Sequence, residues 1–518
     1  MFGKKHSYMR FSESVLWEYQ RDFFSSQGVN AWIGQVPFFI TSNPNIGISY
    51  ARVILAYIKD KVAQGLHNPE LPFYILELGT GPGKFSFYCL KKLTELLDFE
   101  FNGKVKICYI MSDFTKSNVE FWNQHPQLNK FVEAGTLDFA CVDMTNIEAI
   151  TLENSNKQLS KSDFENGLVV IGNYIFDTVP HDAFSVQNGK LFEARCAVEV
   201  PKSNLVNNKP KDLEKIKVTF CKSVVKRLYP EYNEQLKQVL DEYTKSLKST
   251  TFLIPISGIK TLDHLAEISG ENMLVISTDK GATSLEELDN MGDPHVVFHG
   301  SFSMTVNFNA MARYNELKGG DAMLQPCHHG IKTVVMSRGF KFDTCKHLKL
   351  ETQENICDKS PSQFFHMHRH FRKDPIDYGL DTCIAYLVSS HWDPYVFSLI
   401  QNNLLKKLGE LNPAHLEVLD QGMLKLEENI FYMPNHEDHW QLIGTYFQFR
   451  GKYETAIEFS NKSIKFKGEN YSALVNIGFA HNGLKQYEQA ISAFEKALNH
   501  TNDPKPIEKL IQTAKSKL

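Results

Sequence analysis

The pattern of apolar and polar positions is clearest between residues 74 and 97. A short apolar run is followed by three glycines at alternate positions, Gly79, Gly81 and Gly83, and apolar residues then recur at helical spacing. A buried strand, a tight turn and an amphipathic helix produce this order. Glycines permit positive φ and close approach of a ligand to the backbone, and a helix start directs unpaired N–H groups to the same place. We therefore expect a ligand-binding turn that is free of side chains.

Further short apolar runs predict the other strands of one sheet. They lie at 104–111, 137–142, 167–171, 273–278 and 333–336, and the last of them is expected to close the sheet in a hairpin. Helical patterns separate several of these runs, and alternating strands and helices are typical of α/β folds. We predict an α/β, Rossmann-like domain whose ligands bind at the carboxyl ends of its strands.

Two segments interrupt or follow this pattern. Residues 201–249 are rich in lysine and carry apolar residues at helical spacing. We therefore expect a helical insertion that covers the substrate cleft of the first domain, which we expect to span 1–340. Residues 341–385 are polar and are interrupted by Pro361, which favours a linker.

The last third of the chain repeats itself. Trp440, Gly444, Tyr453 and Ala456 are followed, each 34 positions later, by a second set with a large residue, Gly, Tyr and Ala at Leu474, Gly478, Tyr487 and Ala490. This period and this pattern resemble tetratricopeptide (TPR) repeats. We expect an all-α helical array at 386–518, with a degenerate repeat at 394–429 and a polar capping helix at 504–518. Such arrays bind protein partners; a purely structural extension is the alternative.

Composition narrows the classes of protein. The 56 basic and 60 acidic side chains, net charge −4, give no electrostatic indication of nucleic acid or membrane binding. The nine cysteines form no C-x-x-C pair, which favours reduced thiols and no zinc framework. No apolar run reaches the ~18 residues of a membrane span, and the first residues lack the apolar core of a signal peptide. We expect a cytoplasmic protein.

One histidine cluster raises the question of a metal site. His366, His368 and His370 lie close together in the sequence, but no carboxylate or cysteine is placed to complete a coordination shell. We interpret them as a surface cluster and expect no metal.

The glycine spacing separates the ligand classes that use such a turn. A phosphate-binding loop needs Lys and then Ser or Thr after its second glycine, but Lys84 has no partner glycine at that offset and Phe85 stands in the hydroxyl position. The dinucleotide fingerprint fails because the third glycine comes one residue early. The remaining pattern, Glu-x-Gly-x-Gly-x-Gly, resembles the first motif of class I S-adenosylmethionine (SAM) methyltransferases. We expect SAM to contact Glu77, Gly79, Thr80, Gly81 and Gly83, with Glu77 offsetting the cofactor's positive charge; a turn that binds nothing is the alternative.

Two aspartates follow the next strands of the predicted sheet. Asp113 is a candidate to bind the ribose hydroxyls, although it is equally well placed to cap the next helix. Asp143 is a candidate for the adenine amino group, or else a solvated turn residue.

The strand at 167–171 leads into a polar and aromatic turn at the same edge. Asn173 and Asp177 are candidates to orient an acceptor nitrogen, Tyr174 to flank it, and Pro180 to hold the turn rigid.

These motifs occur in an order that resembles the MidA family of SAM-dependent methyltransferases. The segment at 170–184 is similar to that family's Asn-Glu-x-x-Asp-Ala-x-Pro turn, 77–83 to its Glu-Leu-Gly-Pro-Gly-x-Gly, 273–281 to its strand and Asp-Tyr-Gly, and 303–310 to its Thr-x-x-Val-Asp-Phe. The loop at 39–42 resembles Phe-Ile-Thr-Ser, which implies that Thr41 lies over the pocket. Mitochondrial members methylate an arginine of a complex I subunit, so the resemblance implies a protein nitrogen as the acceptor.

Three carboxylates of the family pattern are missing. Asn45 stands near the position of the loop glutamate, Tyr174 replaces the glutamate after Asn173, and Asn307 replaces an aspartate. The leading hypothesis is a divergent SAM-dependent methyltransferase that acts on a protein recruited by its TPR module. The alternatives are a catalytically inactive scaffold that works through the repeats, which the missing carboxylates favour and the intact turn opposes, and a small-molecule methyltransferase with an unrelated docking tail.

Overall fold

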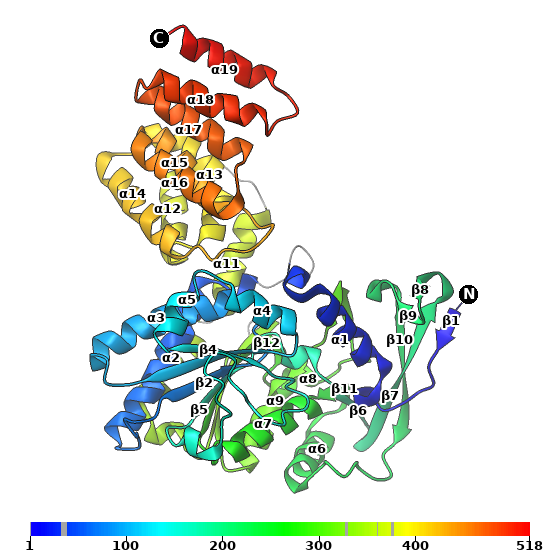
Figure 1. The fold of residues 1–518 in the computed structure, drawn as a ribbon. Helices are drawn as coiled ribbons and strands as arrows, with labels where there is room; N and C mark the ends of the chain where they lie inside the picture. The colour runs from blue at the N-terminus through cyan, green and yellow to red at the C-terminus, as the bar shows by residue number, and fades with distance from the viewer. Residues whose placement is uncertain (1, 33–38, 327–329, 360, 374–377) are drawn as a thin grey trace. The chain divides into compact units, whose positions relative to one another are not determined.

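The computed structural model describes residues 2–32, 39–326, 330–359, 361–373 and 378–518, and it divides into two compact units, 1–365 and 366–518 (Figure 1). Each unit is described by itself. Within the described residues, no helix is long and apolar enough to cross a bilayer.

The first unit is built on a mixed sheet. Its strand order is β16 (Asp321–Leu324), β17 (Ile331–Arg338), β12 (Met273–Ala282), β5 (Leu168–Ile171), β2 (Phe73–Glu77), β3 (Ile107–Asp113) and β4 (Leu137–Cys141), and β15 (Val306–Asn307) also pairs with β12. From β4 to β12 all neighbours are parallel, while β17 runs antiparallel to both β12 and β16. This is a Rossmann-like α/β arrangement with a closing hairpin, and it confirms the predicted fold class.

Both faces of the sheet are covered. Successive side chains of a strand point to opposite faces: Tyr74 and Leu76 of β2 join a core cluster with Ile259 of α7 (Ile256–Ile268), and Phe73 contacts Tyr57 on α2 (Pro44–Ala63). The other covering helices of this unit are α3 (Lys84–Phe101), α4 (Lys116–Asn123), α5 (Asn129–Glu133), α8 (Leu285–Leu288), α9 (Phe308–Leu317) and α10 (Lys346–Thr352). Because β2, β3, β5 and β12 are parallel, the polar residues that follow them meet at one edge.

A second sheet is antiparallel and includes much of the predicted insertion. Its central strand β7 (Lys190–Pro201) pairs with β1 (Phe2–Lys5), β6 (Asp182–Gln187) and β10 (Lys217–Val224), and β6 pairs with β11 (Ser249–Ile254). The prediction of a helical 201–249 is therefore largely wrong.

The reason is visible in the residues used for that prediction. Of the apolar residues at helical spacing, Leu236 and Leu240 lie on a helix, α6 (Glu234–Ser246), which begins where the Asn233 side chain caps it, whereas Val225, Leu228 and Tyr232 precede it. The earlier part forms β10 and the small hairpin β8 (Leu205–Val206) and β9 (Lys209–Pro210). Strand β10 is specified by eight residue pairs with β7, a long-range pairing that has no local signal.

The segment expected as a linker is mostly helical. Residues 346–352 form α10, 353–358 continue as a π-helical turn, and 361–373 form α11 (Pro361–Lys373). Pro361 occupies the first position of α11, where its missing N–H costs nothing, so it starts a helix instead of breaking one. His366 and His370 are exposed as expected, but His368 is buried and its Nδ1 lies 2.7 Å from the Tyr386 hydroxyl.

The second unit is a stack of helices. They are α12 (Leu380–Ser389), α13 (Pro394–Lys407), α14 (Pro413–Glu428), α15 (His439–Phe449), α16 (Tyr453–Lys467), α17 (Tyr471–Gly483), α18 (Tyr487–Leu498) and α19 (Lys505–Lys515). From α15 onward each helix packs on the next (Figure 1). The expected capping helix is α19, whose Ile507 and Ile511 are buried against α18.

Candidate functional site

The glycine turn lies between β2 and α3, as the sequence predicts. Gly79, Gly81 and Gly83 have φ of 62°, 62° and 88°, a region that side chains adopt only at a cost. The turn is not free of side chains, however. A Cβ at Gly79 would lie 2.5 Å from Ile175 Cδ1, one at Gly81 2.7 Å from Trp32 Cζ2, and one at Gly83 2.6 Å from Met111 Cε. The expectation of an open turn is therefore wrong for this conformation, because Trp32 covers Gly81.

Asp113 ties this turn to the next helix. Its Oδ2 accepts hydrogen bonds from Gly81 N at 3.2 Å and Asn118 Nδ2 at 3.0 Å, and its Oδ1 accepts one from Thr115 N at 2.9 Å. The carboxylate is buried, and burial raises its pKa. The N-cap of α4 is Thr115, so Asp113 does not itself cap that helix, which was the alternative role; it accepts from the backbone N–H of the cap residue. Oδ1 retains capacity for a further donor.

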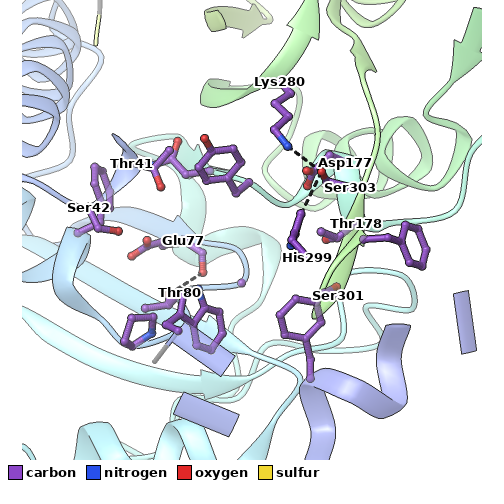
Figure 2. Close-up of a pocket in the computed structure, with 18 residues that line it drawn as sticks. Thr41, Ser42, Glu77, Thr80, Asp177, Thr178, Lys280, His299, Ser301 and Ser303 are labelled. Carbon is purple, nitrogen blue, oxygen red and sulfur yellow. Dashed lines mark hydrogen bonds between the residues drawn. The ribbon is translucent and has the colours of Figure 1, made fainter. Parts of the chain in front are cut away.

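Glu77 and Thr80 also bind the protein itself. Glu77 Oε2 accepts hydrogen bonds from the hydroxyls of Ser86 and, at 2.8 Å, Tyr109, and burial raises the pKa of Glu77 to about 7. Thr80 donates from its backbone N–H to Ser112 O and accepts from Ser112 N at its hydroxyl. Both residues also line a pocket beside the turn (Figure 2).

Asp143 lies in a separate small cavity of about 210 Å³, which Pro180 also lines. The guanidinium of Arg21, from α1 (Val15–Gln27), forms an ion pair with Asp143 Oδ2 at 2.6 Å and stands 4.6 Å from the centre of the Phe114 ring. Burial acts to raise the pKa of Asp143, but hydrogen bonds from Arg21 and Thr145 outweigh it and lower the pKa. Asp143 is thus a paired side chain, and its present partner comes from the protein.

The pocket beside the turn is a cavity of about 100 Å³. It gathers the side chains predicted to bind cofactor and acceptor at the carboxyl edge of the sheet: Thr41, Glu77, Gly79, Thr80, Asn173, Tyr174 and Asp177. Gly81, Gly83 and Asp113 do not line it, and Asp143 and Pro180 belong to the neighbouring cavity. Phe24 and Thr178 line both cavities.

Asn173 is fixed with its amide nitrogen unpaired. Its Oδ1 accepts hydrogen bonds from the Tyr50 hydroxyl at 2.8 Å and from Thr278 N at 3.0 Å. Its Nδ2 is buried and has no partner among the described residues. The next residue, Tyr174, has φ of 48°, and such a conformation in a bulky residue often marks a functional turn.

Asp177, in the same turn, has a buried carboxylate oxygen, Oδ1, without a partner among the described residues. Its backbone N–H donates to Asp279 Oδ2 at 3.1 Å. Burial raises the pKa of Asp177 to about 7, against the opposing effect of Lys280, and burial together with Asp177 raises the pKa of Asp279. Two residues that each have a buried polar atom without a partner among the described residues, Asn173 and Asp177, therefore line one pocket.

A hydrogen-bonded row completes the pocket wall (Figure 2). Lys280 Nζ donates to Ser303 Oγ at 2.8 Å, and His299 Nε2 lies 3.1 Å from the same oxygen. Burial lowers the pKa of His299, so its ring is neutral at pH 7, and its tautomer decides whether Nε2 donates to or accepts from the Ser303 hydroxyl.

The sequence did not identify this row or the neighbouring Asp279. Asp279 and Lys280 lie near the carboxyl end of the apolar strand β12, as Asp113 lies at the end of β3, and an acidic residue at that place is a signal that the sequence offers. His299 and Ser303 lie on the short strands β13 (Val297–His299) and β14 (Ser301–Ser303). The segment 303–310 that resembles the family pattern begins at Ser303 but gives that residue no role, and His299 belongs to no motif. Of the three replaced carboxylates, Asn307 is structural, since its Oδ1 accepts from Ala310 N and its Nδ2 donates to Leu253 O.

These observations define an α/β domain with a candidate small-molecule site at the carboxyl edge of its sheet, and a separate helical repeat unit. The tetratricopeptide repeat family model matches residues 471–499, which confirms the predicted repeat in that segment. No curated protein matches the sequence.

Two solved structures from Burkholderia thailandensis are similar to the chain. One is an uncharacterised COG1565 superfamily protein, with 13% identity over 65% of this chain and 90% of that chain and a TM-score of 0.38. The other is a COG1565 superfamily member bound to S-adenosylhomocysteine, for which methyl transfer is the suggested activity; it has 14% identity over 64% of this chain and 88% of that chain, and a TM-score of 0.39.

Proposed function

We propose that this chain is a SAM-dependent methyltransferase that acts on a nitrogen atom of a protein, and that its helical unit recruits that protein. The observation that carries the proposal is the pair of unpartnered buried atoms beside the glycine turn, Asn173 Nδ2 and Asp177 Oδ1. A buried polar atom without a partner costs about 1–3 kcal/mol, and such groups are typical of sites that a ligand completes.

The residues fit an S-adenosyl cofactor in their chemistry. The glycine turn and Glu77 would face its amino acid part, Asp113 Oδ1 has capacity for one ribose hydroxyl, and Phe114 with Asp143 offers an aromatic face and an acceptor for the adenine amino group. When bound, this cofactor supplies an electrophilic methyl group. Trp32 and Arg21 stand in these positions now, so binding requires both side chains to move.

The protein's own contribution is to orient the acceptor and to take its proton. A nitrogen nucleophile that gains a methyl group must lose a proton, and Asp177 Oδ1, which has no partner among the described residues, would receive it. A general base works best when its pKa is near the working pH, and the pKa of Asp177 is raised to about 7. Asn173 Nδ2 would direct the acceptor by donating to a neighbouring oxygen of the substrate.

A scaffold without catalysis is the second candidate. The pocket of about 100 Å³ is smaller than the ~300–1,000 Å³ of typical ligand sites, and Trp32 covers the turn. On this hypothesis the glycines serve the packing of Trp32, Ile175 and Met111.

Calorimetric titration with SAM and S-adenosylhomocysteine decides between these candidates. We expect binding, together with transfer of label from methyl-labelled SAM into lysate proteins. Asp177→Asn should keep its affinity for S-adenosylhomocysteine within about threefold while labelling falls by at least about 100-fold. Asp98→Asn, a change at an exposed aspartate on α3, is the matched control. No binding up to millimolar ligand would remove the enzyme proposal and leave the scaffold.

Recruitment by the helical unit is tested in the full chain. Phe449 and Phe479 are 64% and 37% exposed, on α15 and α17, which pack against each other. Exposed aromatic side chains on adjacent helices are candidate contacts for a protein partner. Replacing both by Ser should reduce protein labelling and leave cofactor affinity unchanged, whereas Phe99→Ser, at an 86% exposed position of α3, should change neither.

A further inference from the structure

Helix α1 is anchored along one side of the candidate cofactor site. Trp17 Nε1 donates to Phe11 O at 2.7 Å, and Gln20 Nε2 donates to Phe302 O at 2.6 Å; both side chains are buried. The backbone of α1 is therefore held in place, and adjustment at the site falls to the other side chains of α1 that line the cavity, Glu18, Arg21 and Phe24.

Arg21 occupies the position that suits an adenine ring. Its planar guanidinium faces the Phe114 ring at 4.6 Å and donates to Asp143 at 2.6 Å. An adenine base would use the same two groups, stacking on the aromatic face and donating from its amino group to the carboxylate. A guanidinium and an aminopurine are both flat and both carry N–H donors at the edge, so only one of them fits against Phe114 and Asp143 at a time.

We propose that Arg21 is a built-in competitor of the adenine base, so that the chain inhibits its own cofactor binding through this contact. The inference rests on the proposed cofactor. Arg21 is 48% exposed and Asp143 29% exposed, and ion pairs of such exposure contribute little. The guanidinium therefore leaves readily into solvent when a base arrives, and its departure reduces affinity only moderately.

The inference predicts that removing the competitor tightens binding. Calorimetric titration with adenosine and with S-adenosylhomocysteine should show that Arg21→Ala binds each ligand about three- to tenfold more tightly than the parent chain. The factor should be the same for both ligands, because Arg21 competes with the base that they share. Arg21→Lys, which keeps the charge but loses the flat fork, should fall between the two, and Arg52→Ala, at an exposed arginine of α2, should match the parent.

The outcomes separate this inference from the proposed function. If the parent chain binds S-adenosylhomocysteine and Arg21→Ala binds equally or more weakly, Arg21 supports the base or is irrelevant, and the inference is overturned while the cofactor proposal stands. If no variant binds either ligand, the cofactor proposal fails and this inference falls with it. Added salt offers a second readout: by screening the ion pair, it should narrow the difference between the parent chain and Arg21→Ala, and an unchanged difference would contradict the competition.

Discussion

The backbone N–H of Asp177 donates a hydrogen bond of 3.1 Å to the carboxylate of Asp279. This contact joins the turn after β5 to the end of β12 and holds two buried carboxyl groups close together. Two such groups cannot easily both be ionised, and burial disfavours the charged form of each. The pair therefore holds a proton more readily than an exposed aspartate does, and Asp177 is its member that lines the pocket.

Stability should therefore depend on this pair between pH 4 and 8. The folded pKa of Asp177 is about 7, above the ordinary value of 3.8, and that of Asp279 is raised as well. The folded state binds more protons than the unfolded state in this range, so the free energy of unfolding falls as the pH rises toward and through 7. Asp279→Asn removes one of the two ionisations, and the loss of stability between pH 5 and pH 8 should be smaller than in the parent chain.

Urea unfolding at the two pH values measures this difference. Glu77, whose pKa is also raised to about 7, contributes equally to both proteins and does not affect the comparison. Asp98→Asn, at an exposed position, should follow the parent chain. If the free energy of unfolding falls equally between pH 5 and pH 8 in Asp279→Asn and in the parent chain, ionisation of Asp279 does not contribute to the pH dependence, and the prediction is wrong.

The contact between Gly81 and Trp32 predicts a graded effect of alanine. Gly81→Ala imposes a strained positive φ and also places a Cβ 2.7 Å from the indole. Gly103→Ala carries a similar strain, φ 75°, but has nothing within 4 Å. The first substitution should lower the free energy of unfolding by about 1–3 kcal/mol more than the second.

A double-mutant cycle identifies the indole as the cause. In the background of Trp32→Ala, Gly81→Ala should cost about as much as Gly103→Ala, because only the backbone strain remains. If Gly81→Ala costs the same whether or not Trp32 is present, the indole does not rest on the turn in solution.

Loss of the buried ion pair of Arg10 should lower the free energy of unfolding more than Gly81→Ala does. Arg10 Nε donates to Asp182 Oδ1 at 2.7 Å and its Nη1 donates to Glu231 at 2.8 Å, with Arg10 and Asp182 both almost fully buried. Arg10→Met leaves the Asp182 charge without its partner, and breaking a buried pair in this way costs about 3–5 kcal/mol. Thermal and urea unfolding should show this loss, and Arg227→Met, at an exposed arginine, should not. Adding Asp182→Asn to Arg10→Met should recover part of the stability; if it does not, the unpaired charge is not the source of the cost.

The parts of the fold that could be predicted are those with a local cause. The strand, turn and helix around Gly79 follow from apolar runs and from glycines that require positive φ, and the 34-residue repeat follows from small residues where helices pack closely. Strand β10 could not be predicted, because its partner β7 lies far away in the sequence and its own residues alternate weakly. Pro361 was misinterpreted because proline both ends and begins helices, and only the cap context decides.

The residues of the candidate site also fall into those that could be predicted from the sequence and those that could not. Asn173, Asp177 and Glu77 could be placed at one edge because they follow parallel strands. Residues that reach the pocket from elsewhere, such as Trp32 and His299, carry no signal of their own in the sequence. The sequence also suggests ligands for Asp113 and Asp143, whereas the fold gives both carboxylates partners within the protein. A motif identifies the groups that are available, and packing decides how many of them remain unpaired.

The helix pairs α15–α16 and α17–α18 differ at one contact, and this difference predicts opposite effects for the same substitution. Gly444 and Gly478 occupy equivalent positions, but a Cβ at Gly444 would lie 3.1 Å from Ser460 Oγ, a hydroxyl that can rotate, whereas one at Gly478 would lie 2.4 Å from the ring of Phe494. Phe494 is almost fully buried and cannot move without disturbing α18 and α19. Gly444→Ala should be neutral or stabilising by up to about 1 kcal/mol, because alanine favours the helix, and Gly478→Ala should destabilise the unit by about 1–3 kcal/mol. Thermal unfolding followed by far-ultraviolet circular dichroism measures both variants in the full chain, and equal effects of the two substitutions would contradict the packing described for α17 and α18.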